Sequence, residues 1–533
     1  MEETNSVINE RKNKLNKLFF GWVNDNYDKY FIFILLTAFI LRIFIFIKTL
    51  NQPVWWDGAD YLSAAKRLGL NLEIRDIWYY RRGFLFPLIS APFFMFGLGE
   101  VGVRFLEILF STGFVFISYF LVMRLTNKKV ALLTSICLSF SWLLLFFSGR
   151  ILTDIPAAFF ILLSFLFFWD GYFLKKGNKY IYFSAVMFVL AVLTRMQSLM
   201  IAPAFLFIAF MKEKYRMFSN KKLWIAVLFF ATLMIPQFYL YSVHYGNPVT
   251  DIGSHYLGIG EKAEATGNER IFSFAIFNYI LDLPYILGDW IFYLFLIGIF
   301  FFFFDLILGF DKVFKNEELQ KKFFVLFFLA CIFLIMGYVG SVSYVEQRYV
   351  TAALPFLFLI TVYPLVKLGE VLEKKQNLNK KLSNFIILCI LLLLLIPNFN
   401  LANSMIEEKK TSYLEVKQAG LWIKENSNPE DKIISNSVPQ ITYYSERSTY
   451  PFDPGFYGTK LGKKDFEKYS DDLEGFLNFV NEIRPRYLIV SIFQWHPDWA
   501  IEYPQKHQDL LTPVQVYNQG EQPILIIYEF KYN

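Results

Sequence analysis

The chain has few cysteines and histidines for its length. Three cysteines and four histidines occur among 533 residues. All three cysteines fall inside apolar runs, where a thiol behaves as a small buried hydrophobe, so no disulfide framework is predicted. They are Cys137, Cys331 and Cys389. The histidines are scattered without the close spacing of a ligand pair, so the sequence predicts no histidine metal site.

Charge is also scarce, and apolar residues take its place. Asp, Glu, Lys and Arg make up 18% of the chain, whereas 55% is hydrophobic and 63 residues are Phe. Soluble domains contain about 45–50% apolar residues, so the composition predicts a polytopic α-helical membrane protein. Since a spanning helix needs about 20 mostly apolar residues, we predict eleven spans. They lie at residues 30–48, 103–123, 129–148, 155–172, 180–194, 198–211, 223–243, 284–304, 323–342, 350–366 and 383–397.

The distribution of Lys and Arg orients these spans. Basic residues concentrate in alternate loops, as the positive-inside rule requires if the N-terminus is cytoplasmic. Segment 84–98 is short and broken by prolines, so we predict that it re-enters the membrane or lies at its interface. The N-terminal 28 residues are polar and the first apolar run is long, so no removable signal peptide is expected.

The character of the chain changes after the last apolar run. Helix signals at 412–425 and 471–483 alternate with strand-like segments at 432–435, 486–491 and 523–530. This alternation predicts a small α/β domain, which the loop charges place outside the membrane. We therefore divide the chain into a transmembrane domain, residues 1–400, and an extracytoplasmic α/β domain, residues 401–533.

Two short outer loops carry the candidate acidic residues. Asp57 and Asp60 follow the first span and are three residues apart, which places both on one face of a helix. The alternative is a solvated interfacial turn that Trp55 and Trp56 anchor. Asp154 lies in the next outer loop, where it serves either as a site residue or as a helix cap ahead of a proline.

Five arginines are predicted on the same outer face. They are Arg81, Arg82, Arg150, Arg195 and Arg348, the last followed by Tyr349. The alternative for any one of them is that it snorkels to the membrane interface. A carboxylate can deprotonate an incoming hydroxyl, and the planar fork of a guanidinium suits phosphate oxygens. Together these groups favour transfer of a group from a lipid phosphate to an alcohol or amine.

The order of these motifs resembles that of a known family. It runs from Asp57, through Arg81-Arg82-Gly83-Phe84-Leu85-Phe86-Pro87 and Gly99-Glu100-Val101-Gly102-Val103-Arg104-Phe105, to Arg150-x-x-x-Asp154, Leu193-Thr194-Arg195 and Arg348-Tyr349. The chain resembles GT-C glycosyltransferases of the protein O-mannosyltransferase and aminoarabinose-transferase type. The resemblance implies a GT-C-like membrane domain of about eleven spans with a trailing extracytoplasmic α/β domain.

The resemblance also implies an activity. The reaction would be inverting transfer of a sugar from a polyprenyl- or dolichyl-phosphate donor to a protein, lipid or envelope glycan acceptor. Asp57 would be the base that activates the acceptor, Asp154 would assist it, and Asp60 is a second candidate for the base. The lipid phosphate would be held by Arg81, Arg82 and Arg348, with Arg150, Arg195 and Tyr349 as further candidates.

Several alternatives stay open at this stage. In the aminoarabinose transferases the segment matching 81–87 contains an acidic residue that this chain lacks, so no metal ligand is predicted there. Mg²⁺ or Mn²⁺ is left open as a cofactor. The expected partners are a lipid-linked sugar donor, an acceptor and membrane lipids, without nucleic acid. A transporter or flippase of lipid-linked sugars is the alternative function, and a non-catalytic envelope subunit is a third.

Overall fold

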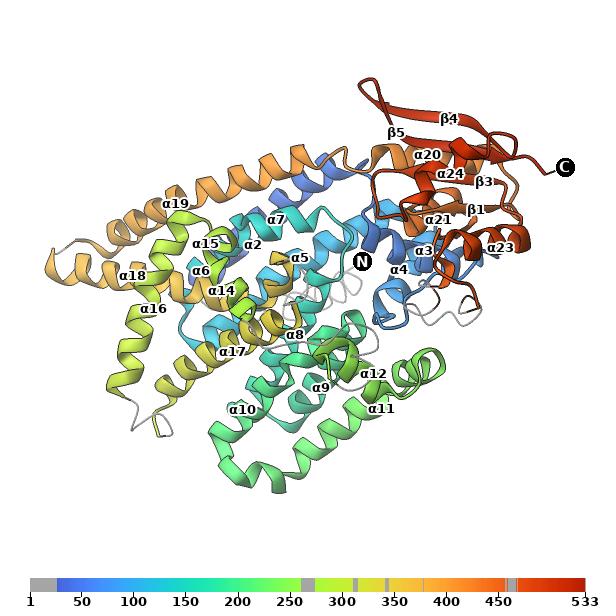
Figure 1. Cartoon of the computed structure of the whole chain (residues 1–533). Coiled ribbons are helices and arrows are strands. Elements are labelled where there is room, and N and C mark those ends of the chain that lie inside the picture. Colours follow the sequence, from blue (N-terminus) through green and yellow to red (C-terminus); the bar gives the residue numbers. More distant parts are fainter. Residues whose placement is uncertain are drawn as a thin grey trace, which may run out of the picture.

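The computed structural model describes residues 26–259, 274–309, 315–340, 345–376, 378–455, 458, 466 and 468–532. In this part of the chain, a long helical bundle carries a small β-sheet with its own helices at one end (Figure 1). The sheet and its helices follow the last long helix of the bundle in sequence. We call this C-terminal region the sheet domain.

Nine helical segments among the described residues are long and apolar enough to cross a membrane. They are Asn26–Thr49 (α2), Gly99–Leu125 (α5), Asp154–Phe173 (α8 and the turn after it), Met196–Ser219 (around α10), Lys221–Tyr245 (α11), Asp289–Leu308 (α16), Glu317–Tyr338 (within α17), Gln347–Lys374 (around α18) and Lys380–Glu408 (α19). The bent pair of α6 (Lys128–Phe140) and α7 (Trp142–Ser148) makes a tenth. The remaining predicted span, 180–194, falls on the shorter apolar helix α9 (Asn178–Thr194). Residues 341–342 of the predicted span 323–342 lie outside the described residues.

The segment after the first long helix does not cross the bundle. Helix α3 (Trp56–Leu70) is followed by α4 (Leu85–Met95), which is 11 residues long. At about 1.5 Å per residue, α4 is too short to span a membrane. The two helices cross closely, since a Cβ on Gly69 would meet the carbonyl oxygen of Ala91 at 2.5 Å. Both lie at the end of the bundle that contacts the sheet domain (Figure 1).

The sheet domain contains a five-stranded mixed sheet in the order β2-β1-β3-β5-β4. Its strands are β1 (Lys432–Ser435), β2 (Ser448–Tyr450), β3 (Tyr487–Ser491), β4 (Leu511–Gln519) and β5 (Gln522–Phe530). Its helices are α20 (Leu414–Asn426), α21 (Val438–Ser445), α23 (Leu473–Ile483) and α24 (Trp499–Lys506). Strands β1, β2 and β3 are parallel, whereas β5 pairs antiparallel with β3 and β4.

Alternation along the strands places a helix layer on each face of the sheet. In β1, Ile433 packs with α20 and α21, while its neighbour Ile434 packs with α23 and α24. Successive strand side chains point to opposite faces, so a strand of consecutive isoleucines is buried on both sides. The predicted α/β class of this region is therefore confirmed. The predicted helices and strands match α20, β1, α23, β3 and β5, whereas α21, β2, α24 and β4 were not predicted.

The sheet domain is tied to α3 by both apolar and polar contacts. Tyr443 and Tyr444 of α21 pack in the same buried cluster as residues of α3 and α4. The Lys66 ammonium of α3 pairs with Glu446 at 2.6 Å. The predicted domain boundary at residues 400 and 401 falls inside α19, which continues to Glu408. The end of the apolar run is thus not the end of the helix, and the sheet domain begins beyond α19.

Candidate active site

The two acidic residues of the first loop lie together at the start of α3, Asp57 in its first turn and Asp60 in the next. Asp57 and Asp60 both bind the guanidinium of Arg82, at 2.7 Å from Asp57 Oδ1 and 3.0 Å from Asp60 Oδ2. Their spacing of three residues places both carboxylates on one helix face, as predicted. The amide groups at a helix N-terminus favour negative charge, so this position also stabilises the carboxylates.

Two glycines bring neighbouring segments close to this turn. A Cβ on Gly58 would meet the carbonyl oxygen of Ile151 at 2.7 Å, so the loop before α8 lies directly against α3. A Cβ on Gly83 would meet the carbonyl oxygen of Leu193 at 2.0 Å. The backbone beside Arg82 therefore packs against the end of α9. These contacts leave no room for a side chain at either position.

Arg348 is shared between three carboxylates. It precedes α18, and its guanidinium lies 3.1 Å from Asp57 Oδ2, 3.8 Å from Asp154 Oδ2 and 3.2 Å from Glu346 Oε2. The Arg348 guanidinium therefore connects α3, the start of α8 and the loop that carries Arg348. Its sequence neighbour Tyr349 presents a ring to the guanidinium of Arg195, 4.6 Å from the ring centroid.

Asp154 is the first residue of α8 and is 2% exposed at the side chain. Its Oδ1 lies 3.1 Å from Arg195 Nη1. Thr153 occupies the N-cap position without a side-chain cap bond, so the carboxylate of Asp154 is directed to arginines rather than to the helix end. Thr153 Oγ1 instead lies 3.0 Å from Tyr61 OH. We call the group formed by Asp57, Asp60, Arg82, Asp154, Arg195 and Arg348 the acid–arginine cluster.

Arg81 lies outside this cluster although it precedes Arg82. Its Nε and Nη2 each donate to an oxygen of Asp251 at 2.8 Å, and the Asp251 side chain is fully buried. The hydroxyls of Tyr241 and Tyr256 both donate to the Arg81 carbonyl at 3.2 Å. The two residues of the ion pair are 170 positions apart, so nothing local in the sequence indicated it.

Arg150 lies behind Trp55 rather than beside the carboxylates. Its guanidinium stacks on the Trp55 ring at 3.6 Å and on the Phe146 ring at 4.2 Å from the centroids. Nearby, Arg104 donates to the carbonyls of Gly149 at 3.0 Å and Gln52 at 2.6 Å. Arg104 therefore fixes the loop that carries Arg150. No ion pair joins Arg150 to the acid–arginine cluster among the described residues.

The charges around Asp57 set its protonation state. Burial by itself raises the pKa of this carboxyl, but the positive charges of Arg82, Arg348 and Arg195 outweigh burial and lower the pKa well below its usual range. Beside the cluster, where Glu346 pairs with Arg348, burial raises the pKa of the Glu346 carboxyl. Asp57 is therefore a stable anion at neutral pH as long as its arginines are not occupied by another anion.

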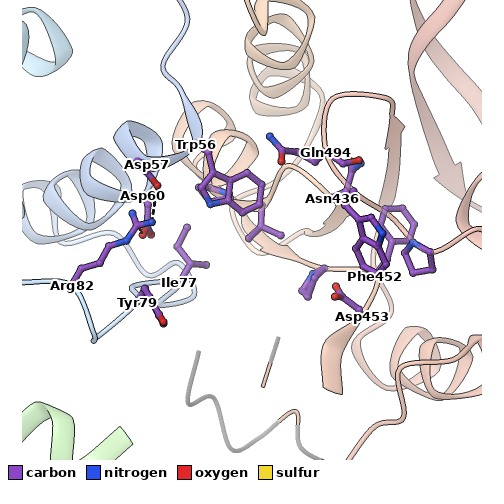
Figure 2. A pocket seen from close by; sticks show the side chains of 15 residues that line it. Trp56, Asp57, Asp60, Ile77, Tyr79, Arg82, Asn436, Phe452, Asp453 and Gln494 are labelled. Carbon is purple, nitrogen blue, oxygen red and sulfur yellow. Dashed lines mark hydrogen bonds and ion pairs between the residues drawn. The ribbon is translucent and has the colours of Figure 1, made fainter. Parts of the chain in front are cut away.

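A cavity of about 380 Å³ opens between the first turn of α3 and the sheet domain. We call it the interface cavity. From the bundle side it is lined by Trp56, Asp57, Asp60, Ile77, Tyr79 and Arg82, and from the sheet domain by Asn436, Val438, Pro439, Pro451, Phe452, Asp453, Gln494, Trp495 and Pro497. Figure 2 shows Trp56 between the carboxylates of α3 and the residues of the sheet domain. The sheet domain therefore forms part of the candidate site.

The carboxylates of the cluster are a poor donor set for a divalent cation. Asp57, Asp60 and Asp154 each face a guanidinium, which already supplies the positive charge that a metal would bring. In the part of the chain that the structure describes, no group of three or more His, Cys, Asp or Glu side chains is arranged to hold a metal ion.

The fold is similar to that of two kinds of membrane glycosyltransferase. ArnT from Cupriavidus metallidurans, solved bound to undecaprenyl phosphate, aligns with a TM-score of 0.63 at 11% identity over 94% of this chain and 98% of that one. The oligosaccharyltransferase of Archaeoglobus fulgidus aligns with a TM-score of 0.59 at 14% identity over 88% of this chain and 70% of that one. The chain thus has the GT-C fold of integral-membrane glycosyltransferases, which confirms the resemblance and the fold class.

Sequence comparison indicates the same class over part of the chain. Residues 83–240 match the family model described as dolichyl-phosphate-mannose-protein mannosyltransferase. An uncharacterized protein of Aquifex aeolicus is 31% identical over 118 residues, which are 22% of this chain and 23% of that protein. The chain thus matches about a quarter of the length of this relative. The matched family segment contains Asp154 and Arg195 together with helices α4 to α9.

Proposed function

We propose that this protein transfers a sugar from a polyprenyl- or dolichyl-phosphate-linked donor to a hydroxyl acceptor at the membrane surface, with inversion at the sugar carbon. The observation that carries the proposal is the carboxylate of Asp57, which two guanidinium groups hold at the floor of the interface cavity. The names of similar proteins support a lipid-phosphate donor. ArnT was solved with undecaprenyl phosphate, and the Archaeoglobus fulgidus oligosaccharyltransferase, AglB, was solved with dolichol-phosphate and an inhibitory peptide.

The transfer needs a base and a place for the leaving group. Asp57 accepts the proton of the acceptor hydroxyl while the acceptor oxygen forms a bond to the anomeric carbon of the donor. The bond from that carbon to the phosphate oxygen breaks, and the electron pair leaves with the lipid phosphate. Arg348 and Arg195 stabilise the anion that departs, so catalysis rests on positioning and fixed positive charge.

Asp57 suits the role of base better than the other carboxylates of the cluster. Its side chain is 29% exposed and lines the interface cavity, whereas the side chain of Asp154 is 2% exposed and does not line it. Asp60 also lines the cavity but is 6% exposed and faces Arg82. A base must reach the hydroxyl that it deprotonates, and this requirement favours the more accessible group. Asp154 then orients Arg195 and Arg348.

The lowered pKa of Asp57 links its basicity to donor binding. A carboxylate between two guanidinium groups is a weak base, and a base works best with a pKa near the working pH. Arg348 is shared between several carboxylates, so a phosphate competes for it directly. Once the phosphate occupies this arginine, the Asp57 carboxylate loses a partner and gains a negative neighbour, and its pKa rises. Donor binding therefore activates the base.

We also propose the orientation in the membrane. Helix α5 runs from Glu100, which accepts a hydrogen bond from Tyr443 of the sheet domain, to Arg124, which pairs with Asp170 at the opposite end. Lys176 also pairs with Asp170 at that end, and Lys128 begins α6 directly after α5, as the positive-inside rule expects for a cytoplasmic face. The acid–arginine cluster and the sheet domain then lie outside the cytoplasm, with the N-terminus inside.

The proposal is tested by transfer of label with Asp57→Asn. Purified protein in lipid nanodiscs is given radiolabelled polyprenyl-phosphate hexoses and an extract of envelope acceptors. Loss of the base lowers the transfer rate by about 10²- to 10⁴-fold, while the asparagine keeps the size of the side chain. Asp170→Asn, which changes a carboxylate at the other end of the bundle, is the matched control and keeps the rate. Unchanged transfer by Asp57→Asn removes this residue from the chemistry.

A further inference from the structure

The sheet domain presents one tryptophan to the interface cavity. Trp495 lines the cavity and is 73% exposed, which is unusual for so large an apolar side chain. Trp499, in the following helix, instead packs on Phe476 with ring centroids 4.8 Å apart. Tyr443 and Tyr444 are buried against α3. Trp495 therefore differs from these three aromatic residues, because its ring is free to meet a ligand in the cavity.

The loop that carries Trp495 is held in place by a buried amide. Asn436 Nδ2 donates to the carbonyls of Ser491 at 3.0 Å and Gln494 at 2.9 Å. The Ser491 hydroxyl donates back to Asn436 Oδ1 at 3.0 Å. These bonds fix the backbone from the end of β3 to Gln494, immediately before Trp495. The cavity wall is therefore organised before a ligand arrives, which reduces the ordering cost of binding.

The cavity combines flat apolar faces with polar side chains. Trp56, Phe452 and Trp495 supply aromatic rings, while Asp453 and Gln494 supply a carboxylate and an amide. A pyranose ring has apolar C–H faces that stack on aromatic rings and hydroxyl edges that bond to such polar groups. The volume of about 380 Å³ lies within the roughly 300–1,000 Å³ of small-ligand sites.

The same lining is poorly suited to a peptide or to an anionic headgroup. Three of its residues, Pro439, Pro451 and Pro497, have no backbone N–H to donate to a peptide carbonyl. Among the described lining residues, Arg82 is the one basic side chain, and it already faces Asp57 and Asp60. With Asp453, the described lining carries three carboxylates. Because the Arg82 guanidinium is already paired, the described lining offers a phosphorylated acceptor no unpaired cation.

We propose that the acceptor is a neutral glycan, whose terminal sugar binds in the interface cavity against Trp495 and presents a hydroxyl to Asp57. This inference rests on the proposed function for the role of Asp57, but glycan binding can be measured without any transfer. The sheet domain is then the part of the protein that selects the acceptor, whereas the bundle binds the donor.

The test measures binding and transfer separately. Full-length protein in nanodiscs is screened on an array of neutral and acidic oligosaccharides and Ser/Thr peptides, and each binder is titrated by calorimetry. We expect a neutral oligosaccharide to bind wild type, and Trp495→Ala to weaken that binding by at least about tenfold. Ile492→Ala is the matched control, because Ile492 is 63% exposed and three residues earlier but does not line the cavity. It keeps wild-type affinity.

The outcomes distinguish this inference from the proposed function. Binding of a neutral oligosaccharide that Asp57→Asn retains, without transfer by wild type, supports the glycan site and contradicts the enzyme. Transfer to a Ser/Thr peptide without any glycan binding contradicts the glycan site and leaves the enzyme in place. Absence of both overturns both. Glycan binding that Trp495→Ala leaves unchanged also overturns the assignment of this cavity.

Discussion

Two neighbouring arginines, Arg81 and Arg82, take part in ion pairs of different kinds. Arg81 makes a two-pronged contact with Asp251 in which both oxygens are bound at 2.8 Å and the aspartate is fully buried. Arg82 lies at the edge of a cavity and divides its donors between Asp57 and Asp60. The Arg81–Asp251 pair therefore has a single arrangement, whereas Arg82 belongs to a cluster in which several charged groups share partners.

Two features distinguish an arginine with a structural role from one in the candidate site. They are the solvent accessibility of its ion pair and the number of carboxylates that it contacts. Removing one partner of a buried ion pair leaves an unpaired charge in the protein interior. Because this costs much free energy, the two residues of such a pair stay together. A cluster in which Arg348 serves three carboxylates has several arrangements of similar energy. An incoming anion exchanges with one carboxylate there without leaving a bare charge. We therefore propose that the donor phosphate binds the cluster rather than Arg81.

The largest effect is expected from breaking the buried pair. Arg81→Ala leaves Asp251 buried without its guanidinium partner and lowers the free energy of unfolding by about 3–5 kcal/mol. Arg82→Ala is the adjacent control and costs much less stability, because Asp57 keeps Arg348 and the site opens to a cavity. Unfolding in mixed micelles of rising SDS content measures both. Equal losses for the two variants contradict the comparison.

The next effect concerns the shared arginine. Arg348→Lys keeps one positive charge but removes the planar fork that reaches Asp57 and Asp154 together. We expect the transfer rate to fall by about 10²-fold, as for loss of one donor to a developing anion. Steady-state kinetics with a polyprenyl-phosphate sugar measures this change. Lys322→Arg, at the other end of the bundle, tests whether an exchange between Lys and Arg is harmful in general. If Arg348→Lys transfers sugar at the wild-type rate, the planar guanidinium that bridges Asp57 and Asp154 is not needed for transfer.

A smaller effect is expected in the pH dependence. The arginines lower the pKa of Asp57, so in the free enzyme its charge is lost only as the pH falls through that lowered value. On the proposed mechanism, donor phosphate takes up arginine donors and raises this pKa. The acidic limb of kcat, which reports the donor complex, then lies at least about one pH unit above that of kcat/KM. Coincident limbs mean that donor binding does not activate the base.

The smallest effect tests how the sheet domain is attached. Tyr443→Phe removes the hydrogen bond from the Tyr443 hydroxyl to Glu100 Oε2, 3.1 Å long, and keeps the ring in its apolar cluster. We expect a loss of about 1 kcal/mol in the free energy of unfolding. Tyr487→Phe is the control, because its hydroxyl donates to the carbonyl of Asn426 at 2.9 Å within the sheet domain. If Tyr443→Phe lowers the transfer rate while the free energy of unfolding falls by only about 1 kcal/mol, this contact also positions the interface cavity.

Much of the architecture could be predicted from the sequence. The spans follow from apolar length alone, because a helix in a membrane must satisfy its own backbone hydrogen bonds. Asp57, Asp154, Arg195 and Arg348 were predicted on one face, and the structure brings them together. Glu346, two residues before Arg348, lies with them and pairs with Arg348 at 3.2 Å.

The sequence by itself determined the membrane class, the sheet domain and the carboxylates at the mouth of the bundle, since these depend on local composition and spacing. The tertiary structure alone decided that Arg81 pairs with Asp251 and that Arg150 lies behind Trp55. It also decided that Trp495 and Asp57 line the same cavity. Each of these contacts joins residues far apart in the chain, so no local pattern specifies them. They depend on how the helices and the sheet domain pack.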